Sequence, residues 1–313
     1  MGSPVLHIPS PLQEIILPEI TEAKIRLFVK RDDLIHPYVS GNKWRKLEYN
    51  IAAFKASKKA KLLTFGGAFS NHLVATAAAC NQADVPCMGV IRGEDADFNN
   101  PTLAVAAAQG MELHAINREE YNLKAMPEYK EELYNRFGSV FVVPEGGANH
   151  YGVNGCMNIV KELKFSPDYV AVATGTGTTL AGISIAADKK TKVIGFPALK
   201  GGVFIENEAR KLLYQTLFDE DYVKEILNKV TLETRFHFGG YGKVDENLVA
   251  FVNHFYQKTH IPLDLVYTGK LFFGLMNLIA SGYFPAGSSI VAIHTGGLQG
   301  NEGMKSRGVK LVF

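Results

Sequence analysis

The sequence has few of the residues that build disulfides or metal sites. It contains three cysteines, Cys80, Cys87 and Cys156, an odd number without a Cys-X-X-Cys pair, and its nine histidines show no His-Glu-X-X-His spacing. We therefore expect the cysteines to pack as small apolar side chains, and we expect no metal ligand set.

Excess charge of one sign and long apolar runs are also lacking. The net charge is +2 over 313 residues, without a long basic run, so neither nucleic acid nor an anionic membrane is expected as a partner. No apolar stretch approaches the ~20 residues that span a bilayer, and residues 1–13 lack a basic segment followed by an apolar core. These features predict a cytoplasmic protein whose partner is a small molecule.

What the sequence does contain is an alternation of short apolar segments with helical ones. Strands are predicted at 27–30, 61–65, 86–91, 112–116, 169–173, 193–196 and 289–294, and helices at 71–83, 100–109, 153–163, 180–187, 210–217, 246–258 and 271–281. This alternation is typical of an α/β fold built on parallel sheets. A glycine-rich turn at 144–149 interrupts it, and there we expect the chain to return from one domain to another.

A loop rich in glycine and threonine opens the helix predicted at 180–187. It reads Gly175, Thr176, Gly177, Thr178 and Thr179. Backbone N–H groups and hydroxyls in such a loop converge on a phosphate, with help from the helix N-terminus. A dinucleotide fingerprint would need a third glycine at position 180, and a P-loop would need Gly-Lys-Ser/Thr, so both are disfavoured. A tight turn that needs glycine only for its backbone freedom is the alternative.

Three more polar loops accompany strands, at residues 66–72, 266–270 and 294–297. In the first of them, Ser70 or Asn71 could serve only as the N-cap of the alanine-rich helix that follows. Capping alone, however, would not require His72. Each loop taken by itself is a weak signal of function.

Lys43 is the candidate catalytic residue. It lies in the first turn of a predicted helix, for which Ser40 or Asn42 can supply the N-cap. Positive charge is disfavoured at a helix N-terminus, so the dipole there favours the neutral amine that attack on a carbonyl requires. The alternative is a solvated lysine in a basic patch with Arg45 and Lys46, and Lys46 is expected on the solvated side of the helix.

Together these segments resemble, in identity and order, the fold-type II pyridoxal-phosphate enzymes, and most closely the family of D-cysteine desulfhydrase and 1-aminocyclopropane-1-carboxylate (ACC) deaminase. The resemblance extends from about Leu27 to Gly297. Residues 200–245 match poorly, and residues 298–303 depart from the many relatives that continue with Pro-Ala and a further helix. The specific parts are Lys30-Arg31-Asp32-Asp33, Gly41-Asn42-Lys43, Arg45-Lys46-Leu47-Glu48-Tyr49, and Gly66-Gly67 with Ser70-Asn71-His72.

The resemblance implies pyridoxal 5′-phosphate as cofactor and assigns residues to it. Lys43 would hold the cofactor covalently and act as the base, Asn71 would contact the ring hydroxyl, and residues 175–179 would bind the phosphate. The full set of cofactor-binding residues implied is Lys43, Asn71, Gly175, Thr176, Gly177, Thr178, Thr179 and Thr295. The substrate would be received by Ser70, Asn71, His72, Tyr267 and Thr268, with Ser70 and Tyr267 also catalytic.

The resemblance also implies a two-domain α/β architecture like that of the tryptophan synthase β subunit. Each domain would be an open, mostly parallel sheet flanked by helices, with the cofactor in the cleft between them. Residues 1–49 and 152–313 would form the larger, cofactor-binding domain, and residues 50–151 the smaller one. A homodimer is implied as well.

The choice of reaction depends on Thr268 and Thr295. By resemblance, ACC deaminases carry an acidic residue at the first position and leucine at the second, whereas D-cysteine desulfhydrases carry small hydroxyl residues at both. A carboxylate near the pyridine nitrogen would strengthen the electron sink, whereas a neutral hydroxyl suffices for β-elimination. We therefore expect elimination of pyruvate, sulfide and ammonia from D-cysteine. The alternatives are ACC deamination to 2-oxobutanoate and ammonia, and a non-catalytic cofactor-binding protein.

Overall fold

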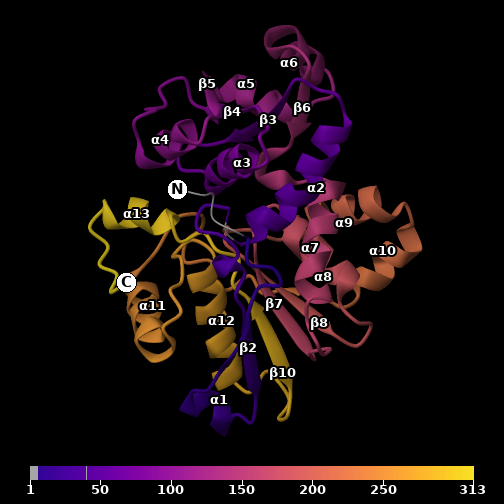
Figure 1. Cartoon of the computed structure of the whole chain (residues 1–313). Coiled ribbons are helices and arrows are strands. Elements are labelled where there is room, and N and C mark those ends of the chain that lie inside the picture. The colour runs from indigo at the N-terminus through magenta and orange to yellow at the C-terminus, as the bar shows by residue number, and fades with distance from the viewer. Residues whose placement is uncertain (1–5, 40) are drawn as a thin grey trace.

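The computed structural model describes residues 6–39 and 41–313, whose strands form two separate sheets (Figure 1). The larger sheet has the order β1-β2-β10-β7-β8-β9, in which β1 runs antiparallel to β2 and the other neighbours are parallel. The smaller sheet has the order β5-β4-β3-β6 and is parallel throughout. The strands are β1 (Leu12–Ile15), β2 (Arg26–Lys30), β3 (Lys61–Gly66), β4 (Cys87–Arg92), β5 (Glu112–Ile116), β6 (Val140–Val143), β7 (Tyr169–Thr174), β8 (Lys192–Pro197), β9 (Val230–Leu232) and β10 (Ser289–Ile293). The predicted α/β class is confirmed.

Both faces of the larger sheet are buried, because apolar residues occupy successive strand positions. On β2, Leu27 and Val29 join one core and Phe28 joins the core on the opposite face. Helices α1 (Pro18–Glu22), α11 (Glu246–Thr259) and α12 (Thr268–Ala280) cover the first face. Helices α7 (His150–Lys161), α8 (Thr178–Ala186) and α9 (Phe204–Leu217) cover the second, with α10 (Glu220–Leu227) packed outside them. The larger sheet is thus the middle of three layers.

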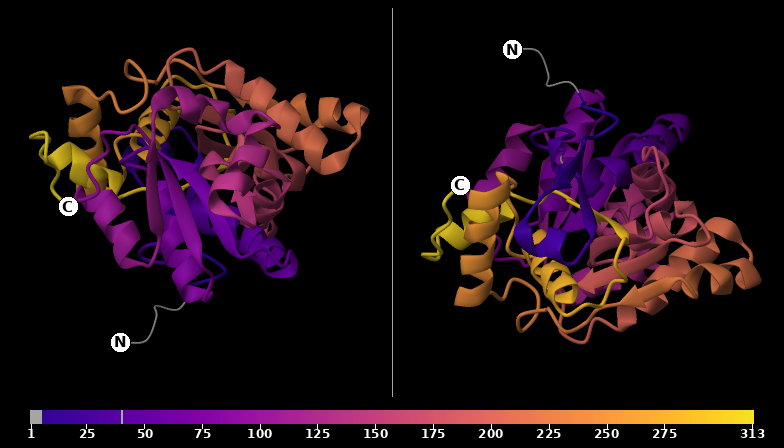
Figure 2. Two further views of the ribbon diagram at one scale, coloured as in Figure 1. Left: turned by 90° about the horizontal axis from the view of Figure 1, so that it is seen from above. Right: turned by 90° about the horizontal axis from the view of Figure 1, so that it is seen from below.

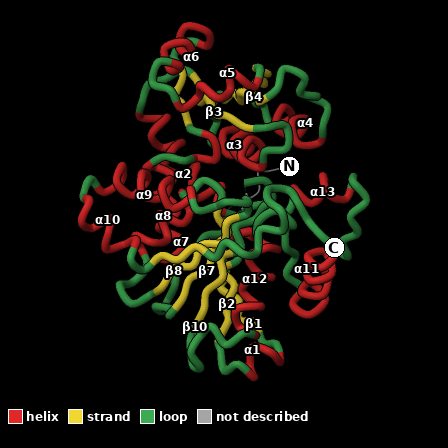
Figure 3. The backbone as a smooth tube through the Cα atoms, turned by 180° about the vertical axis from the view of Figure 1, so that it is seen from behind, coloured by secondary structure: helices red, strands yellow, loops and turns green. Residues whose placement is uncertain are grey.

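The smaller sheet is covered in the same way. Helices α2 (Asn42–Ala56), α3 (Asn71–Gln82) and α4 (Pro101–Ala108) lie on one face, and α5 (Arg118–Asn122) and α6 (Tyr129–Phe137) lie on the other. Figure 3 shows the strands of the two sheets, in yellow, set apart from one another. The strands of the smaller sheet fall within residues 61–143, and the domain boundaries at 50 and 151 stay a prediction.

Helix α2 connects the two sheets. Its apolar side chains Leu47, Ile51 and Phe54 lie in the core of the smaller sheet, while its other side lies on α7. The contact with α7 is close, because a Cβ on Gly155 would lie 1.7 Å from the carbonyl oxygen of Arg45. The helix that carries Lys43 is therefore held from both sides.

A buried ion network fixes the same helix to the larger sheet. The Arg45 guanidinium lies 2.9 Å from Asp32 Oδ1 and also pairs with Glu162, which follows α7. Glu162 in turn accepts a hydrogen bond of 2.6 Å from Lys30 Nζ at the end of β2. Removing one partner from such a network leaves a buried charge uncompensated, so the network fixes the helix firmly.

The predicted strands and helices are all present, with ends that differ by a few residues. The elements that the sequence did not predict are β1, β6, β9, α1, α5, α6, α10 and α13 (Gly300–Lys305), most of which are short. The three cysteines are buried among apolar side chains, as predicted. Helices α9 and α10 lie on the opposite side of the molecule from α13, as Figure 2 also shows.

Among the described residues, no helix combines the length and apolar character needed to cross a bilayer. Over the same residues, no three or more His, Cys, Asp or Glu side chains gather into a group that could hold a metal ion.

Candidate active site

Lys43 lies in the first turn of α2, as predicted, but its helix is capped differently. The N-cap residue is a glycine without a side-chain cap, so the prediction that Asn42 caps the helix was wrong; Ser40, the other predicted cap, lies outside the described residues. The Asn42 side chain instead joins two site segments. Its Oδ1 accepts a hydrogen bond of 2.8 Å from Lys43 Nζ, and its Nδ2 donates one of 2.9 Å to Thr179 Oγ1.

The loop before Lys43 is pressed against the turn that follows β10. Gly41 has φ +65°, and a Cβ on it would lie 1.8 Å from the carbonyl oxygen of Thr295. The backbone N–H of Asn42 donates to the same oxygen at 3.3 Å. Only glycine fits at position 41, on grounds of both conformation and space. Thr295, a predicted cofactor residue, therefore lies beside the lysine segment.

The surroundings of Lys43 favour its neutral amine. Burial, followed by the neighbouring charge of Lys46, lowers the pKa of Lys43 to about 7, against the opposing effects of Asp264 and Cys156. At neutral pH, about half of such amines are unprotonated and able to attack a carbonyl. The predicted direction of the pKa shift is confirmed, although burial rather than the helix dipole is its largest cause.

Lys46 is buried rather than solvated, so that expectation was wrong. Only 5% of Lys46 is exposed, because its stem packs on the Gly146–Gly147 turn and the far side of α2 is covered by α7. Burial lowers the pKa of Lys46, and Cys156 is the neighbour that raises it. Within residues 6–39 and 41–313, no carboxylate forms an ion pair with this ammonium. Lys46 is therefore a buried amine beside the site without an ion-pair partner among these residues.

His72 is buried near both lysines and is held neutral. The hydroxyl of Thr64 donates to the carbonyl of Val143 at 2.9 Å, so its oxygen accepts a hydrogen bond from His72 Nε2 at 2.9 Å. His72 Nδ1 is then a bare acceptor, buried and without a partner in the described part of the chain. Burial, followed by the charges of Lys43 and Lys46, lowers the pKa of His72 to about 3.

Ser70 and Asn71 lie where the loop after β3 enters α3. The Ser70 hydroxyl accepts a hydrogen bond from Leu73 N at 3.4 Å, so the N-cap function considered for it is present. The Asn71 side chain approaches the segment after Thr295, where a Cβ on Gly297 would lie 3.3 Å from Asn71 Nδ2. The structure thus brings the loop of the smaller sheet to the turn after β10 of the larger one.

The loop from Gly175 to Thr179 opens α8 with its backbone donors uncapped. Gly177 is the N-cap residue with φ +77° and makes no side-chain cap. The hydroxyls of Thr176 and Thr178 lie 3.1 Å apart, and Thr179 holds Asn42 as described above. The loop therefore places hydroxyls, and N–H groups without a side-chain cap, next to the lysine helix, and its binding of a phosphate stays a prediction.

Tyr267 and Thr268 lie at the start of α12, around a carboxylate that sequence reasoning missed. Asp264 Oδ2 accepts hydrogen bonds from the backbone N–H groups of Val266 and Tyr267, each at 2.8 Å. Its Oδ1 accepts from Thr268 N at 2.8 Å and from Thr268 Oγ1 at 2.7 Å. A Cβ on Gly297 would lie 3.7 Å from the same Oδ1. Tyr267 and Thr268 thus lie in the same region as the turn after β10.

A second tyrosine, also missed, comes from the segment whose sequence matched the family poorly. The rings of Tyr241 and Tyr267 lie 6.0 Å apart, nearly perpendicular, and burial raises the pKa of both hydroxyls. The loop of Tyr241 is held by the buried Lys270, whose Nζ donates to the carbonyls of His237 at 2.9 Å and Gly240 at 2.7 Å. The sequence of this loop lacks the hydrophobic periodicity of a helix or strand, and its glycines indicate only a turn.

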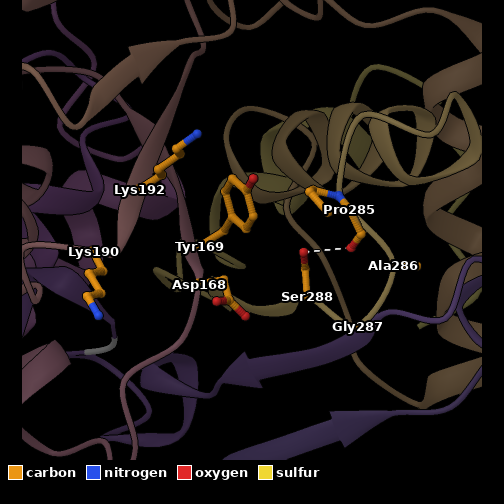
Figure 4. A pocket seen from close by; sticks show the side chains of 8 residues that line it. All are labelled: Asp168, Tyr169, Lys190, Lys192, Pro285, Ala286, Gly287 and Ser288. Carbon is orange, nitrogen blue, oxygen red and sulfur yellow. Dashed lines mark hydrogen bonds between the residues drawn. The ribbon is translucent and has the colours of Figure 1, made fainter.

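The hollow drawn in Figure 4 is a separate feature. It is lined by the loops that precede β7, β8 and β10 and by the first residues of β7 and β8, among them Asp168, Lys192 and Ser288. In a parallel sheet these loops lie at the edge opposite to the carboxyl ends of the strands, where Gly175 and Thr295 are found. The candidate active site is therefore the cluster around Lys43.

Residues 6–296 match the family described as "Pyridoxal-phosphate dependent enzyme", and the chain belongs to that family. Its fold is that of the fold-type II enzymes, and it is a pyridoxal-phosphate-dependent enzyme of the ACC deaminase and D-cysteine desulfhydrase group.

Three relatives illustrate the group. The sequence is 31% identical over 319 residues to the mitochondrial bifunctional D-cysteine desulfhydrase/ACC deaminase of Arabidopsis thaliana, covering 94% of this chain and 77% of the relative. It is 27% identical to the ACC deaminase of Ralstonia pickettii, covering 94% of each. The solved structure of an ACC deaminase homologue superimposes with a TM-score of 0.79 at 28% identity, covering 98% of this chain and 96% of that one.

The residues present fit pyridoxal phosphate. Lys43 provides an amine with a pKa of about 7, and the start of α8 provides uncapped N–H groups for a phosphate. The bare His72 Nδ1 and the Thr174 hydroxyl at the end of β7 are buried polar groups without partners among the described residues. Buried polar groups of this kind are normally satisfied, so these two lack the partner that a bound polar group would supply.

Proposed function

We propose that Lys43 binds pyridoxal phosphate covalently through Nζ. Residues 175–179 receive the phosphate at the start of α8, and the nearby ammonium of Lys46 compensates its charge. Asn71 contacts the ring, and Thr295 lies under the lysine segment. The support for these roles is the convergence of α2, α8 and the turn after β10, together with the lowered pKa of Lys43.

When bound, the cofactor withdraws electrons from the substrate Cα, and the protein controls geometry and protons. The Lys43 amine would take the substrate Cα proton on Nζ, which its pKa of about 7 allows at neutral pH. Its hydrogen bond to Asn42 Oδ1 orients that amine. The hydroxyl and amide donors of Ser70 and Asn71 receive the substrate carboxylate and so fix the bond that breaks, whereas the only N–H of the His72 ring already donates to Thr64.

We infer that the reaction is the α,β-elimination of D-cysteine to pyruvate, sulfide and ammonia. The observation that carries this inference is the state of Thr268: its hydroxyl proton is bound to Asp264 Oδ1 at 2.7 Å, so residue 268 offers the cofactor a neutral oxygen and no carboxylate. Elimination of a thiolate does not require the stronger electron sink that a carboxylate at this place would create. Tyr267, whose raised pKa keeps its hydroxyl protonated, donates to the departing group.

ACC deamination to 2-oxobutanoate and ammonia is the second candidate. It is favoured by the names of the relatives, since the Ralstonia pickettii protein is an ACC deaminase and the Arabidopsis protein is bifunctional. The two reactions share Lys43 and the phosphate loop, so the difference between them lies in the residues around the substrate.

Parallel assays of the purified holoenzyme with D-cysteine, L-cysteine and ACC separate the candidates. We expect sulfide and pyruvate from D-cysteine, and little product from the other two. Release of 2-oxobutanoate from ACC without sulfide from D-cysteine would overturn the proposal. Replacing Thr268 by Glu and Thr295 by Leu together should depress sulfide release. The matched control is Thr216→Glu, a half-buried threonine on α9 away from the site.

A further inference from the structure

Asp264 is a buried acid that has no role in the reaction proposed above. It is 1% exposed and lies in the segment that leads into α12. Its two carboxylate oxygens accept four hydrogen bonds, three from consecutive backbone N–H groups and one from the hydroxyl of Thr268. The Asp264 backbone N–H donates back to the same hydroxyl at 2.9 Å. A capping side chain usually satisfies one or two N–H groups, so this carboxylate organises an entire turn.

We propose that Asp264 is a positioning residue of the active site: its carboxylate folds residues 266–268 so that Tyr267 faces the phosphate loop and the proton of Thr268 is held inside the turn. The inference rests on the proposed role of Tyr267 and extends it to the residue that sets its place. A Cβ on Gly175 would lie 3.3 Å from the Tyr267 ring, and Gly297 borders the carboxylate on its other side. The turn is thus wedged between the two loops that flank the cofactor.

The same carboxylate borders Gly297 in the turn after β10, and the Thr295 carbonyl of that turn contacts the lysine segment, so its charge also acts on Lys43. The groups that face Lys43 are Lys46, which lowers its pKa, and Asp264 and Cys156, which raise it. Burial raises the pKa of the Cys156 thiol to about 11, so this group is uncharged near pH 7, and His72 is neutral there as well. Burial and the charge of Lys46 lower the pKa of Lys43 and Asp264 opposes them, so the Asp264 carboxylate shifts the pH at which Lys43 becomes a free amine. A residue that only folded a turn would not have this second effect.

The charge effect is tested without substrate, on the full-length apoprotein. The rate at which Lys43 captures pyridoxal phosphate covalently is followed by absorbance from pH 5 to 9. For the wild type we expect a midpoint near pH 7, because only the neutral amine reacts. D264N removes the negative charge, so its midpoint falls to lower pH. D264E keeps the charge and should keep the midpoint, although it disturbs the turn. An unmoved midpoint in D264N would overturn the charge effect.

The positioning effect is tested on turnover of D-cysteine by a double-mutant cycle. At pH 9, where Lys43 is a free amine in every variant, D264N and Y267F each lower kcat, and we expect the double variant to be no slower than the slower single variant, because Asp264 then acts only through Tyr267. Losses that multiply would overturn the proposal. If D264N fails to fold, T268V provides the same test, because it keeps the Asp264 carboxylate and its three backbone partners. The loss of kcat caused by T268V should also vanish in the Y267F background. The pH midpoint at which T268V captures pyridoxal phosphate should stay that of the wild type. Because capture needs no substrate, a wrong choice of substrate would leave that result standing.

Discussion

At the scale of single residues, Lys43 is expected to be indispensable for turnover. K43A removes the amine that binds the cofactor and moves the proton, so activity on D-cysteine should fall to background while the circular dichroism spectrum and melting temperature stay near those of the wild type. K55A is the matched control, since Lys55 is exposed on the last turn of the same helix. Comparable activity of K43A and K55A would remove Lys43 from the mechanism.

Lys46 should affect cofactor affinity rather than the chemical step. A charge-assisted hydrogen bond is worth about 1.5–3 kcal/mol, so K46A should raise the Kd for pyridoxal phosphate by about 10- to 100-fold. Titration of the apoprotein with the cofactor measures this change directly. If Lys46 were solvated, as expected from the sequence, K46A would leave the Kd for pyridoxal phosphate unchanged. K55A again provides the reference.

His72 makes the stability of the protein depend on pH. Its pKa is about 3 in the folded protein and about 6.5 in the unfolded chain, so between these values the unfolded state binds an extra proton. Stability must therefore decline as pH falls below 6.5, by roughly 2 kcal/mol at pH 5 from this group alone. Denaturant unfolding at pH 7 and pH 5 should show a smaller decline in H72Q than in the wild type.

The control for that experiment is H254Q, since His254 is exposed on α11. Its decline between pH 7 and pH 5 should match that of the wild type. Equal declines in the wild type and H72Q would show that His72 already binds a proton in the folded state.

At the scale of elements, the contact between α2 and α7 should tolerate no added atom. A methyl group on Gly155 would lie 1.7 Å from the carbonyl oxygen of Arg45, so G155A must force the helices apart. We expect a loss of about 3 kcal/mol or more in the free energy of unfolding. G303A is the matched control in α13, where a Cβ meets no atom within 4 Å, and it should be neutral or stabilising by about 0.5–1 kcal/mol. Similar melting temperatures for the two variants would contradict the tight packing.

Much of this arrangement follows from local sequence. Most strands of the two sheets are continuous apolar runs. The composition of the glycine-threonine loop is enough to predict the start of α8. The short elements β1 and β9 were missed because edge strands of three or four residues carry little periodic signal. Burial of Lys46 could not be predicted, because the polar side of α2 is covered by α7, which lies about a hundred residues further along the chain.

Some site residues could likewise be predicted from local sequence, and others could not. Lys43, Ser70 and Asn71 stand next to glycines and helix starts, so the sequence indicates them. Asp264 was missed because an aspartate before a helix reads as an ordinary cap, and its four hydrogen bonds exist only in the folded turn. Tyr241 was missed because a long-range contact with Lys270 holds its loop in place.

At the scale of the whole molecule, the family resemblance predicts a homodimer. Sedimentation velocity on the purified holoenzyme should show a species of twice the chain mass of 34.3 kDa at micromolar concentration. A single monomeric boundary over the whole concentration range would contradict this prediction. The domain boundaries and the cytoplasmic location stay predictions as well.

The place of β10 has a consequence for the order in which the protein is made. This strand lies between β2 and β7 in the larger sheet, and the turn after it supplies the carbonyl that borders Gly41. The strands of the smaller sheet occupy one continuous stretch, residues 61–143, which can pair as soon as they leave the ribosome. The larger sheet stays split until residues 289–293 are synthesised. A ribosome must therefore translate about 250 further codons after that of Lys43 before this lysine has a complete cofactor site.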